Sequence, residues 1–277
     1  MRQVQEEDIR GFEKWLQEQE KSPVTVEKYL RDAVRFCRFA AGRRMDKGIA
    51  VSYKAYLIDQ GYGVRSVNSM LGAVNCFLRF MGWEQYRVRT IRLQREVYCR
   101  QERMLTRQEY MRLLEAAEKR PRLHLILQTL GGTGIRISEL SYFTVERVQT
   151  GEITVTCKGK TRRILLPKKL KKRLLAYAER KKIDAGPIFR TRSGKPLDRS
   201  NIWAEMKSLC ARARVNPKKV FPHNLRKLFA RTFYSREKDV AKLADVLGHS
   251  SMDTTRIYIM TAGQEHQRRL DSLGLVI

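Results

Sequence analysis

The sequence has few acidic residues and no long apolar stretch. Its 277 residues include 29 aspartates and glutamates against 57 lysines and arginines, which gives a formal net charge of +28. No run approaches the roughly 18 apolar residues that a membrane-spanning helix needs, and no apolar N-terminal stretch resembles a signal peptide. We therefore expect a cytoplasmic protein that does not enter a membrane.

Cysteine pairs and the motifs that bind nucleotides or metals are also missing. The five cysteines are odd in number and widely spaced, and none forms a CxxC or Cys/His pair. This usage fits a reducing compartment and argues against a zinc site. The sequence contains no GxxxxGKS or GxxxxGKT loop for ATP and no cluster of acids suited to two metal ions. No cofactor or metal is expected.

The excess of positive charge points to a polyanionic partner. The first 100 residues include 19 basic and 12 acidic residues, a net charge of +7, and the remaining residues include 38 and 17, a net charge of +21. Each phosphate that a protein neutralises releases counterions, so nucleic-acid binding gains from charge of this size. A merely cationic surface is the alternative, but solubility needs neither this magnitude nor this asymmetry. Nucleic acid is therefore the expected partner.

Helical periodicity fills the N-terminal part of the chain. Apolar residues recur at helical spacing from Glu7 to Trp83, and three junctions rich in proline, threonine or glycine divide this stretch into four helices. The basic segment from Tyr86 to Arg103 lacks this periodicity and precedes a capping box formed by Thr106 and Glu109. We therefore predict a helical domain over residues 1–85, a basic linker over 86–103 and a second domain over 104–277.

The second domain is predicted to be mostly helical with a small sheet. Two β-like runs, Glu152 to Cys157 and Arg163 to Leu166, flank a polar turn from Lys158 to Thr161 and predict a hairpin. A glycine-rich break at residues 131–134 separates two of the helices. The predicted helices cover 107–118, 123–130, a segment that begins near 137, 168–181, 200–214, 225–235 and 239–247.

Two motifs near the C-terminus carry residues suited to chemistry on a phosphate. His223 and Arg226 are one helical turn apart, so an imidazole and a fixed cation share one face, although a chance His-x-x-Arg is common in a chain this rich in arginine. A Leu-Gly-His motif at 247–249 has the form of a helix end with a glycine C-cap. Capping explains the glycine but gives no reason for the histidine that follows it. Tyr258 follows nine residues later, and one tyrosine among eleven is usually an ordinary core or surface residue.

Two further motifs are an arginine at a glycine-rich break and a lysine hairpin. Arg136 stands in Gly-x-Arg-x-Ser-Glu-Leu, where backbone amides at a helix start favour anions; a simple pair with Glu139 is the alternative. Lys158 and Lys160 lie at the tip of the predicted hairpin, where a lysine is ordinarily only solvated. None of these motifs is specific when taken alone.

Taken in order, the motifs resemble those of the tyrosine recombinase family, which includes phage integrases and Xer-like site-specific recombinases. Gly-x-Arg-x-Ser-Glu-Leu, the lysine hairpin, His-x-x-Arg, Leu-Gly-His and the tyrosine follow one another across residues 104–277. The resemblance implies a mainly α fold, with a helical N-terminal core-binding domain and a C-terminal α+β catalytic domain that contains a small antiparallel sheet. It also implies a catalytic set around the scissile phosphate, with Tyr258 as nucleophile: Arg136, Lys158, His223, Arg226, His249 and Tyr258.

The resemblance further implies site-specific recombination of double-stranded DNA through a covalent 3′-phosphotyrosyl intermediate, without metal or ATP. The arginines would hold the non-bridging oxygens, His223 would take the tyrosine proton and Lys158 would protonate the 5′ oxygen. Members of the family work as tetramers on DNA, with copies of the same chain or a related recombinase, and accessory DNA-bending proteins can take part. We therefore expect the apolar tail from Leu273 to Ile277 to pack into a neighbouring protomer.

Some alternatives stay open on the sequence alone. The spacing to Pro167 would also allow Lys160 as the general acid, although Gly159 directly after Lys158 favours Lys158. A type IB topoisomerase uses similar residues, and a catalytically silent DNA-binding protein would have the same basic surface. The motifs indicate neither the DNA target nor whether the reaction integrates, excises, resolves or inverts DNA.

Overall fold

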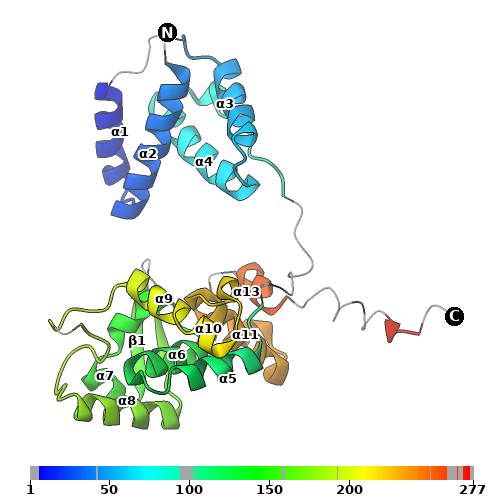
Figure 1. The fold of residues 1–277 in the computed structure, drawn as a ribbon. Helices are drawn as coiled ribbons and strands as arrows, with labels where there is room; N and C mark the ends of the chain where they lie inside the picture. Colours follow the sequence, from blue (N-terminus) through cyan, green and yellow to red (C-terminus); the bar gives the residue numbers. More distant parts are fainter. Residues whose placement is uncertain are drawn as a thin grey trace. The chain divides into compact units, whose positions relative to one another are not determined.

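Two compact units make up the chain. The computed structural model describes residues 6–41, 43–93, 102, 104–157, 160–191, 193–249, 251–260, 267 and 271–274. Contacts between Cα atoms divide the chain into Met1–Arg95 (unit 1) and Glu96–Ile277 (unit 2). Helices make up unit 1 and most of unit 2, and the described strands form one two-stranded antiparallel sheet (Figure 1). The predicted fold class is confirmed.

Unit 1 is a bundle of the four predicted helices. They are α1 (Glu6–Glu18), α2 (Pro23–Ala40), α3 (Lys47–Asp59) and α4 (Val64–Phe80), and a short 3-10 helix, η1 (Glu84–Tyr86), follows. A proline starts α2, where its fixed φ suits a helix and its missing N–H is not needed. The side chains of Ser22 and Asp46 accept backbone hydrogen bonds at the starts of α2 and α3.

Aromatic side chains from all four helices meet in the core of unit 1. Phe12 of α1 packs edge-on against Phe77 of α4, with ring centroids 5.2 Å apart. Phe36 of α2 packs in the same way against Tyr53 of α3, at 5.1 Å. All four rings are fully buried, and each such side chain stabilises the folded state by roughly 1.5–3 kcal/mol. These pairs explain why the apolar periodicity of the sequence produces one bundle.

The first residues of the predicted linker belong to unit 1. Asn75 of α4 donates a hydrogen bond to the carbonyl of Val88 and accepts one from its N–H, both at 2.8 Å. Asn68 holds Ile91 in the same way, also at 2.8 Å. These side chains fix an extended segment that has no helical periodicity of its own, and Val88 is buried in the core. Of the predicted linker, residues 94–101 and 103 lie outside the described residues.

Unit 2 is built around one central helix, α6. Its elements are α5 (Arg107–Ala116), α6 (Pro121–Thr133), η3 (Ile137–Tyr142), α7 (Val145–Thr150), β1 (Glu152–Cys157), β2 (Lys160–Leu165), α8 (Lys168–Arg180), α9 (Arg199–Lys207), α10 (Cys210–Ala213), η4 (Pro217–Lys219), α11 (Pro222–Glu237), α12 (Val240–Leu247) and α13 (Met252–Ile259). Helix α6 packs against α5, α8, α9 and α11 (Figure 1). The predicted capping box of Thr106 and Glu109 starts α5, with both reciprocal hydrogen bonds formed.

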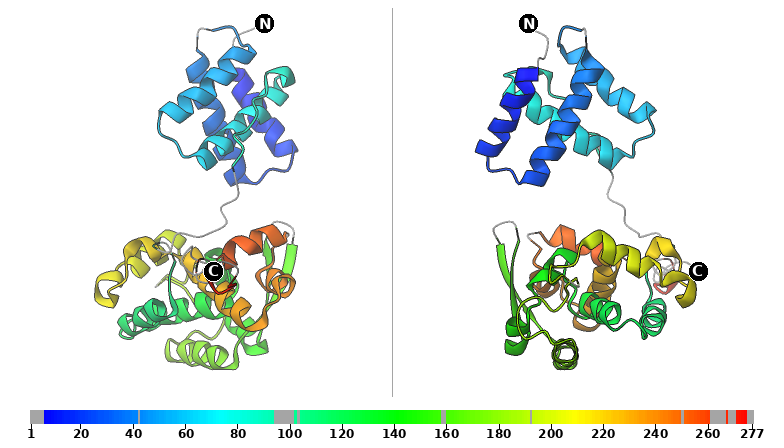
Figure 2. Two further views of the ribbon diagram at one scale, coloured as in Figure 1. Left: turned by 90° about the vertical axis from the view of Figure 1, so that its right-hand side faces the viewer. Right: turned by 60° about the vertical axis from the view of Figure 1, so that its left-hand side comes forward.

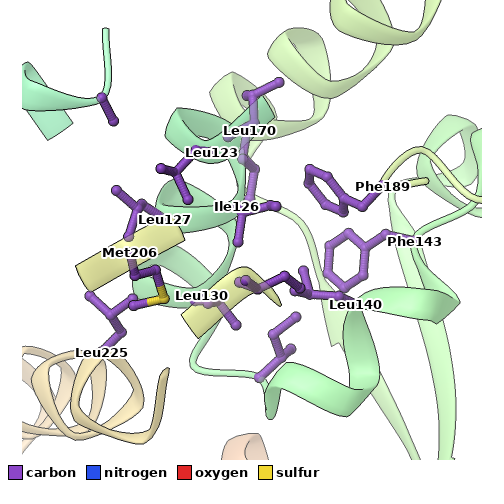
Figure 3. Close-up of a cluster of buried hydrophobic side chains, with 14 of the residues drawn as sticks. Leu123, Ile126, Leu127, Leu130, Leu140, Phe143, Leu170, Phe189, Met206 and Leu225 are labelled. Carbon is purple, nitrogen blue, oxygen red and sulfur yellow. The ribbon is translucent and has the colours of Figure 1, made fainter. Parts of the chain in front are cut away.

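Apolar side chains of α6 form the middle of the unit 2 core. In Figure 3, Ile126 lies between Met206 and Leu225 on one side and Phe143 and Phe189 on the other. These side chains are almost completely buried and come from α6, α9, α11 and the loops next to α7 and α9. Interiors packed this closely resist displacement, so α6 holds α11 in a fixed place.

The predicted hairpin is present, with a shorter turn. β1 and β2 pair antiparallel from Glu152 opposite Leu165 to Cys157 opposite Lys160. β2 therefore begins three residues before its predicted start, and Lys160 and Thr161 belong to the strand rather than the turn. The tip, residues 158–159, lies outside the described residues. In both views of Figure 2 the hairpin lies next to α13.

Several helix predictions need correction. Helix α6 does not end at Leu130, before the predicted glycine break, but runs through Gly131 to Thr133 and is capped by Gly134, whose φ of 64° is left-handed. Gly131 is needed for packing instead, because a Cβ there would lie 2.8 Å from the ring of Tyr110. The helix predicted over 200–214 is divided into α9 and α10, and the one near 137 is the 3-10 helix η3. Helix α13, which carries Tyr258, was not predicted because its exposed residues are mostly polar.

Candidate active site

Five of the six predicted catalytic residues lie in one cluster of unit 2. His249 and Arg226 are in direct contact, with 3.0 Å between Nε2 and Nη2. The ring of Tyr258 lies 4.8 Å from that of His249 and 5.0 Å from that of His223, measured between centroids. Arg136 is close enough to lower the pKa of both histidines by charge repulsion. Lys158 lies outside the described residues.

Helix α11 carries His223 and Arg226 on one face. Pro222 takes the first helical position, where proline is favoured, so the His-x-x-Arg motif occupies the first turns of the helix. The predicted spacing of one helical turn is confirmed, but the two side chains differ in surroundings. His223 is exposed, whereas Arg226 is only 1% exposed and is the largest fully buried side chain among the described residues.

The buried guanidinium of Arg226 joins the C-terminal ends of two other helices. Nη1 donates to the carbonyl oxygen of Gly134 and Nη2 to that of Leu247, both at 2.6 Å. The last carbonyls of a helix have no partner within it and carry its negative dipole end, so they suit a buried cation. Gly134 must be glycine here, because a Cβ would lie 2.3 Å from Phe229 and its φ is left-handed.

Burial lowers the pKa of Arg226 to about 10, and repulsion from Arg136 adds to this effect. The side chain is therefore still a cation at neutral pH. Its Nε is buried and has no hydrogen-bond partner among the described residues. The guanidinium thus keeps a hydrogen-bond donor in addition to those that hold the helix ends.

A buried carboxylate, Glu139, holds the second arginine of the site. Glu139 is 2% exposed and accepts hydrogen bonds from the backbone N–H of Arg136 at 2.7 Å and from its Nη1 at 3.2 Å. It also accepts from Nη2 of Arg162 on β2, at 2.7 Å. The pair with Glu139 that the sequence suggested for Arg136 is therefore present, and Arg136 keeps 37% of its side chain exposed beside the histidines.

Arg162 links the hairpin to the helix that ends before His249. Its Nη1 donates to the carbonyl oxygen of Val246 on α12, at 2.7 Å. Gly248 is the left-handed C-cap of α12, as predicted, and a Cβ there would lie 2.3 Å from Cδ of Arg162. The glycine of the Leu-Gly-His motif therefore serves both the cap and the close approach of this arginine.

Hydrogen bonds engage both ring nitrogens of His249. Nδ1 lies 2.9 Å from Oγ1 of Thr255 on α13, and Nε2 lies 3.0 Å from Arg226. Burial lowers the pKa of His249 to about 4, with further lowering by Arg226, Arg136 and Arg162. The ring is therefore neutral at neutral pH.

The His223 and Tyr258 rings pack against each other, with His223 exposed and Tyr258 buried. Partial desolvation of the ring, followed by repulsion from Lys227 and Arg226, lowers the pKa of His223, although the residue as a whole is exposed. Tyr258 is 8% exposed and lies on α13, whose first turn is capped by the Ser251 side chain. The guanidinium of Arg226 lies 5.8 Å from the centre of the Tyr258 ring.

Sequence reasoning missed two residues that build this site, Arg162 and Thr255. Arg162 lies between the predicted turn and the predicted second strand and was given no role, and nothing in the sequence separates it from Arg163, which is 78% exposed. Thr255 precedes Tyr258 by three residues, so helical spacing would have put both on one face had α13 been predicted. Among the described residues no three His, Cys, Asp or Glu side chains are grouped to hold a metal ion, and no helix there is long and apolar enough to cross a bilayer.

The chain is similar to known recombinases over nearly its whole length. Residues 103–265 match the model of the Phage integrase family, and this range contains the whole predicted catalytic set. The tyrosine recombinase XerA of Thermococcus kodakarensis is 30% identical, over 98% of this chain and 96% of that protein. The chain therefore belongs to the phage integrase family, the tyrosine recombinases, as its motifs suggested. It is a DNA strand-transferring enzyme that performs site-specific recombination.

Solved structures of lambda integrase have the same fold. A lambda integrase dimer bound to a COC′ core site is similar with a TM-score of 0.74 and 17% identity, over 94% of this chain and 96% of that chain. A lambda integrase tetramer bound to a Holliday junction has a TM-score of 0.71 and 18% identity, over 91% of this chain and 76% of that chain. In these structures, lambda integrase is bound to DNA as a dimer and as a tetramer.

The low pKa of His249 predicts a pH dependence of stability. An unfolded chain protonates this imidazole near the ordinary value of 6.5, but the folded protein does so only near 4. Between these values the unfolded state binds more protons, so the folded state loses stability as the pH falls, by at most about 2 kcal/mol between pH 7 and pH 5. Urea unfolding at both pH values would measure this loss, and His249→Gln should lose less than the wild type. Equal losses in the two proteins would contradict the assignment.

Proposed function

We propose that Tyr258 is the nucleophile of the recombination reaction and that Arg136, Arg226 and His249 surround the scissile phosphate. The observation that carries this proposal is the position of the Tyr258 ring, within 5.0 Å of two histidine rings and 5.8 Å from a buried arginine. A nucleophilic hydroxyl group, an imidazole that can accept its proton and fixed cations are groups suited to the transfer of a phosphodiester.

The proposed cleavage exchanges one ester bond for another. The Tyr258 oxygen attacks the phosphorus of a DNA phosphodiester, which forms a 3′-phosphotyrosyl bond and breaks the bond to the 5′ oxygen. The hydroxyl proton of Tyr258 goes to His223, and Lys158 gives a proton to the leaving 5′ oxygen. A 5′-hydroxyl from another strand then attacks the phosphotyrosyl ester and reverses these steps. Because the ester keeps the energy of the broken bond, no ATP is needed.

His223 suits the role of base better than His249. A base must be neutral before it accepts a proton, and the lowered pKa of His223 favours the neutral form at neutral pH. His249 is neutral as well, but its two nitrogens are engaged by Thr255 and Arg226. His223 is exposed next to the Tyr258 ring, where an incoming DNA strand would lie.

The arginines suit the charge that develops on the phosphate. Attack on phosphorus increases the negative charge on the non-bridging oxygens, and guanidinium groups stabilise such oxygens with charge-assisted hydrogen bonds. Arg136 is partly exposed, and the guanidinium of Arg226 is a fixed cation 5.8 Å from the centre of the Tyr258 ring. Glu139 neutralises only part of the charge of Arg136 and Arg162, so the site keeps a positive excess for an anion.

We extend the proposal to the partners. Unit 1 would act as the core-binding domain and unit 2 as the catalytic domain, both on double-stranded DNA in the cytoplasm. By analogy with the lambda integrase complexes, the active form would be a tetramer of this chain or an assembly with a related recombinase, with accessory DNA-bending proteins where the site requires them. The apolar tail from Leu273 to Ile277 would pack into a neighbouring protomer.

A suicide-substrate assay tests the role of Tyr258. Nicked duplexes from the DNA that flanks the gene, incubated with the protein without metal or ATP, should trap an adduct that resists SDS. Tyr258→Phe should form no adduct while binding the same DNA, because only the attacking hydroxyl is lost. An adduct that persists in Tyr258→Phe would assign the nucleophile elsewhere, and binding without any adduct would favour a catalytically silent DNA-binding protein.

A sulfur-containing substrate distinguishes Lys158 from Lys160 as the general acid. When the 5′ bridging oxygen is replaced by sulfur, the leaving thiolate needs no proton, so loss of the general acid should no longer slow cleavage. Lys158→Ala should cleave normal DNA roughly 100 times more slowly and the sulfur substrate at about the wild-type rate. Lys160→Ala is the matched control and should cleave both at nearly the wild-type rate; the reverse pattern would assign the acid to Lys160.

A further inference from the structure

A buried threonine connects the helix of Tyr258 to His249. Thr255 is 0% exposed, and its Oγ1 lies 2.9 Å from Nδ1 of His249. It precedes Tyr258 by three residues on α13, so the two side chains share one face of the helix. The neighbouring Thr254 is exposed. Of these two neighbouring threonines, Thr255 is therefore the one whose hydroxyl group is buried against a residue of the site.

The contact on the opposite side of the ring shows which nitrogen of His249 carries the proton. Nη2 of Arg226 lies 3.0 Å from Nε2, and a guanidinium nitrogen can only donate a hydrogen bond. Nε2 must therefore accept, which means that it carries no proton. A neutral imidazole has one N–H, so the proton lies on Nδ1 and is donated to Oγ1 of Thr255. The low pKa of His249, about 4, is consistent with this neutral form.

We propose that Thr255 is a positioning residue for the recombination reaction: its hydroxyl oxygen accepts the Nδ1 proton of His249 and so fixes the tautomer and the orientation of that ring. The inference rests on the proposed function in so far as His249 and Arg226 act on the phosphate. The hydrogen bonds run from Thr255 through His249 to Arg226, which means that the helix carrying Tyr258 is coupled to the buried arginine.

Loss of the Thr255 acceptor has a definite physical consequence. Without it, the Nδ1–H of His249 has no acceptor, and the other tautomer would place an Nε2–H against the N–H groups of Arg226. Neither tautomer is satisfied in this position, so either the ring or the guanidinium has to turn away, and a ring that has turned away can take the other tautomer. The carbonyl oxygens of Gly134 and Leu247 hold the guanidinium at two other points, which makes the imidazole the group that moves. His249 would then leave its place beside Tyr258.

The tautomer of His249 can be measured directly. The protein has only four histidines, so long-range ¹H–¹⁵N spectra of protein labelled with ¹⁵N-histidine would resolve each ring, and His249→Gln would assign the signal of interest. Wild-type protein should show His249 protonated on Nδ1. Thr255→Val, which keeps the side-chain shape but lacks the acceptor, should shift His249 toward the Nε2-protonated form, whereas Thr255→Ser and the exposed control Thr254→Val should keep the wild-type tautomer.

Adduct formation on the nicked duplex provides the second measurement. Thr255→Val should form the adduct roughly ten times more slowly than wild type with unchanged DNA affinity, and Thr255→Ser should recover most of the rate. A wild-type ring protonated on Nε2, or a Thr255→Val ring with the wild-type tautomer, would overturn the inference while leaving the role of Tyr258 intact. A changed tautomer with an unchanged adduct rate would also overturn it. If the wild type forms no adduct on its cognate DNA, the proposed function fails. The tautomer measurement alone then shows whether Nδ1 of His249 donates a hydrogen bond to Thr255.

Discussion

The buried guanidinium of Arg226 is the interaction on which the site depends. Taking a cation out of water is costly unless hydrogen bonds replace its hydration, and here the replacements are the last carbonyls of two helices and one imidazole nitrogen. The same three contacts fix the ends of α6 and α12 next to α11. Because α6 is also the centre of the unit 2 core, the packing of that core determines where the arginine lies.

The charges around Arg226 give the site an unbalanced positive potential. Arg136 and Arg162 share one buried carboxylate. Desolvation and the neighbouring cations lower the pKa of both histidines, which favours the neutral imidazoles. Arg226 is held by neutral acceptors and the other two arginines share one carboxylate, so the positive charge of the cluster is only partly cancelled. An anion such as a DNA phosphate would complete it, and a neutral imidazole is the form that accepts the proton of a nucleophile.

The sequence predicted the parts of this architecture that depend on local pattern. Four helices follow from apolar periodicity, and Arg136, His223, Arg226, His249 and Tyr258 follow from motifs in a fixed order. Contacts between distant segments leave no such pattern: Arg162 reaches α12 from β2, and Asn75 holds Val88 of the predicted linker. Of the predicted break at residues 131–134, only Gly134 ends the helix, because Gly131 serves a close contact with Tyr110 inside it. The role of Thr255 was not predicted because α13 is partly exposed and mostly polar, so the sequence shows no apolar periodicity there.

One measurement tests the central position of Arg226 most directly: the free energy of urea unfolding of Arg226→Lys compared with Arg136→Lys. A lysine keeps the charge, but its single nitrogen cannot reach the acceptors that Nη1 and Nη2 hold separately, so Arg226→Lys should lower the free energy of unfolding by about 2–4 kcal/mol. Arg136 is partly exposed, and Arg162 remains to pair with Glu139, so Arg136→Lys should cost less than about 1 kcal/mol. Equal, small losses in both variants would contradict the account, because the buried guanidinium would then not be what holds the site together.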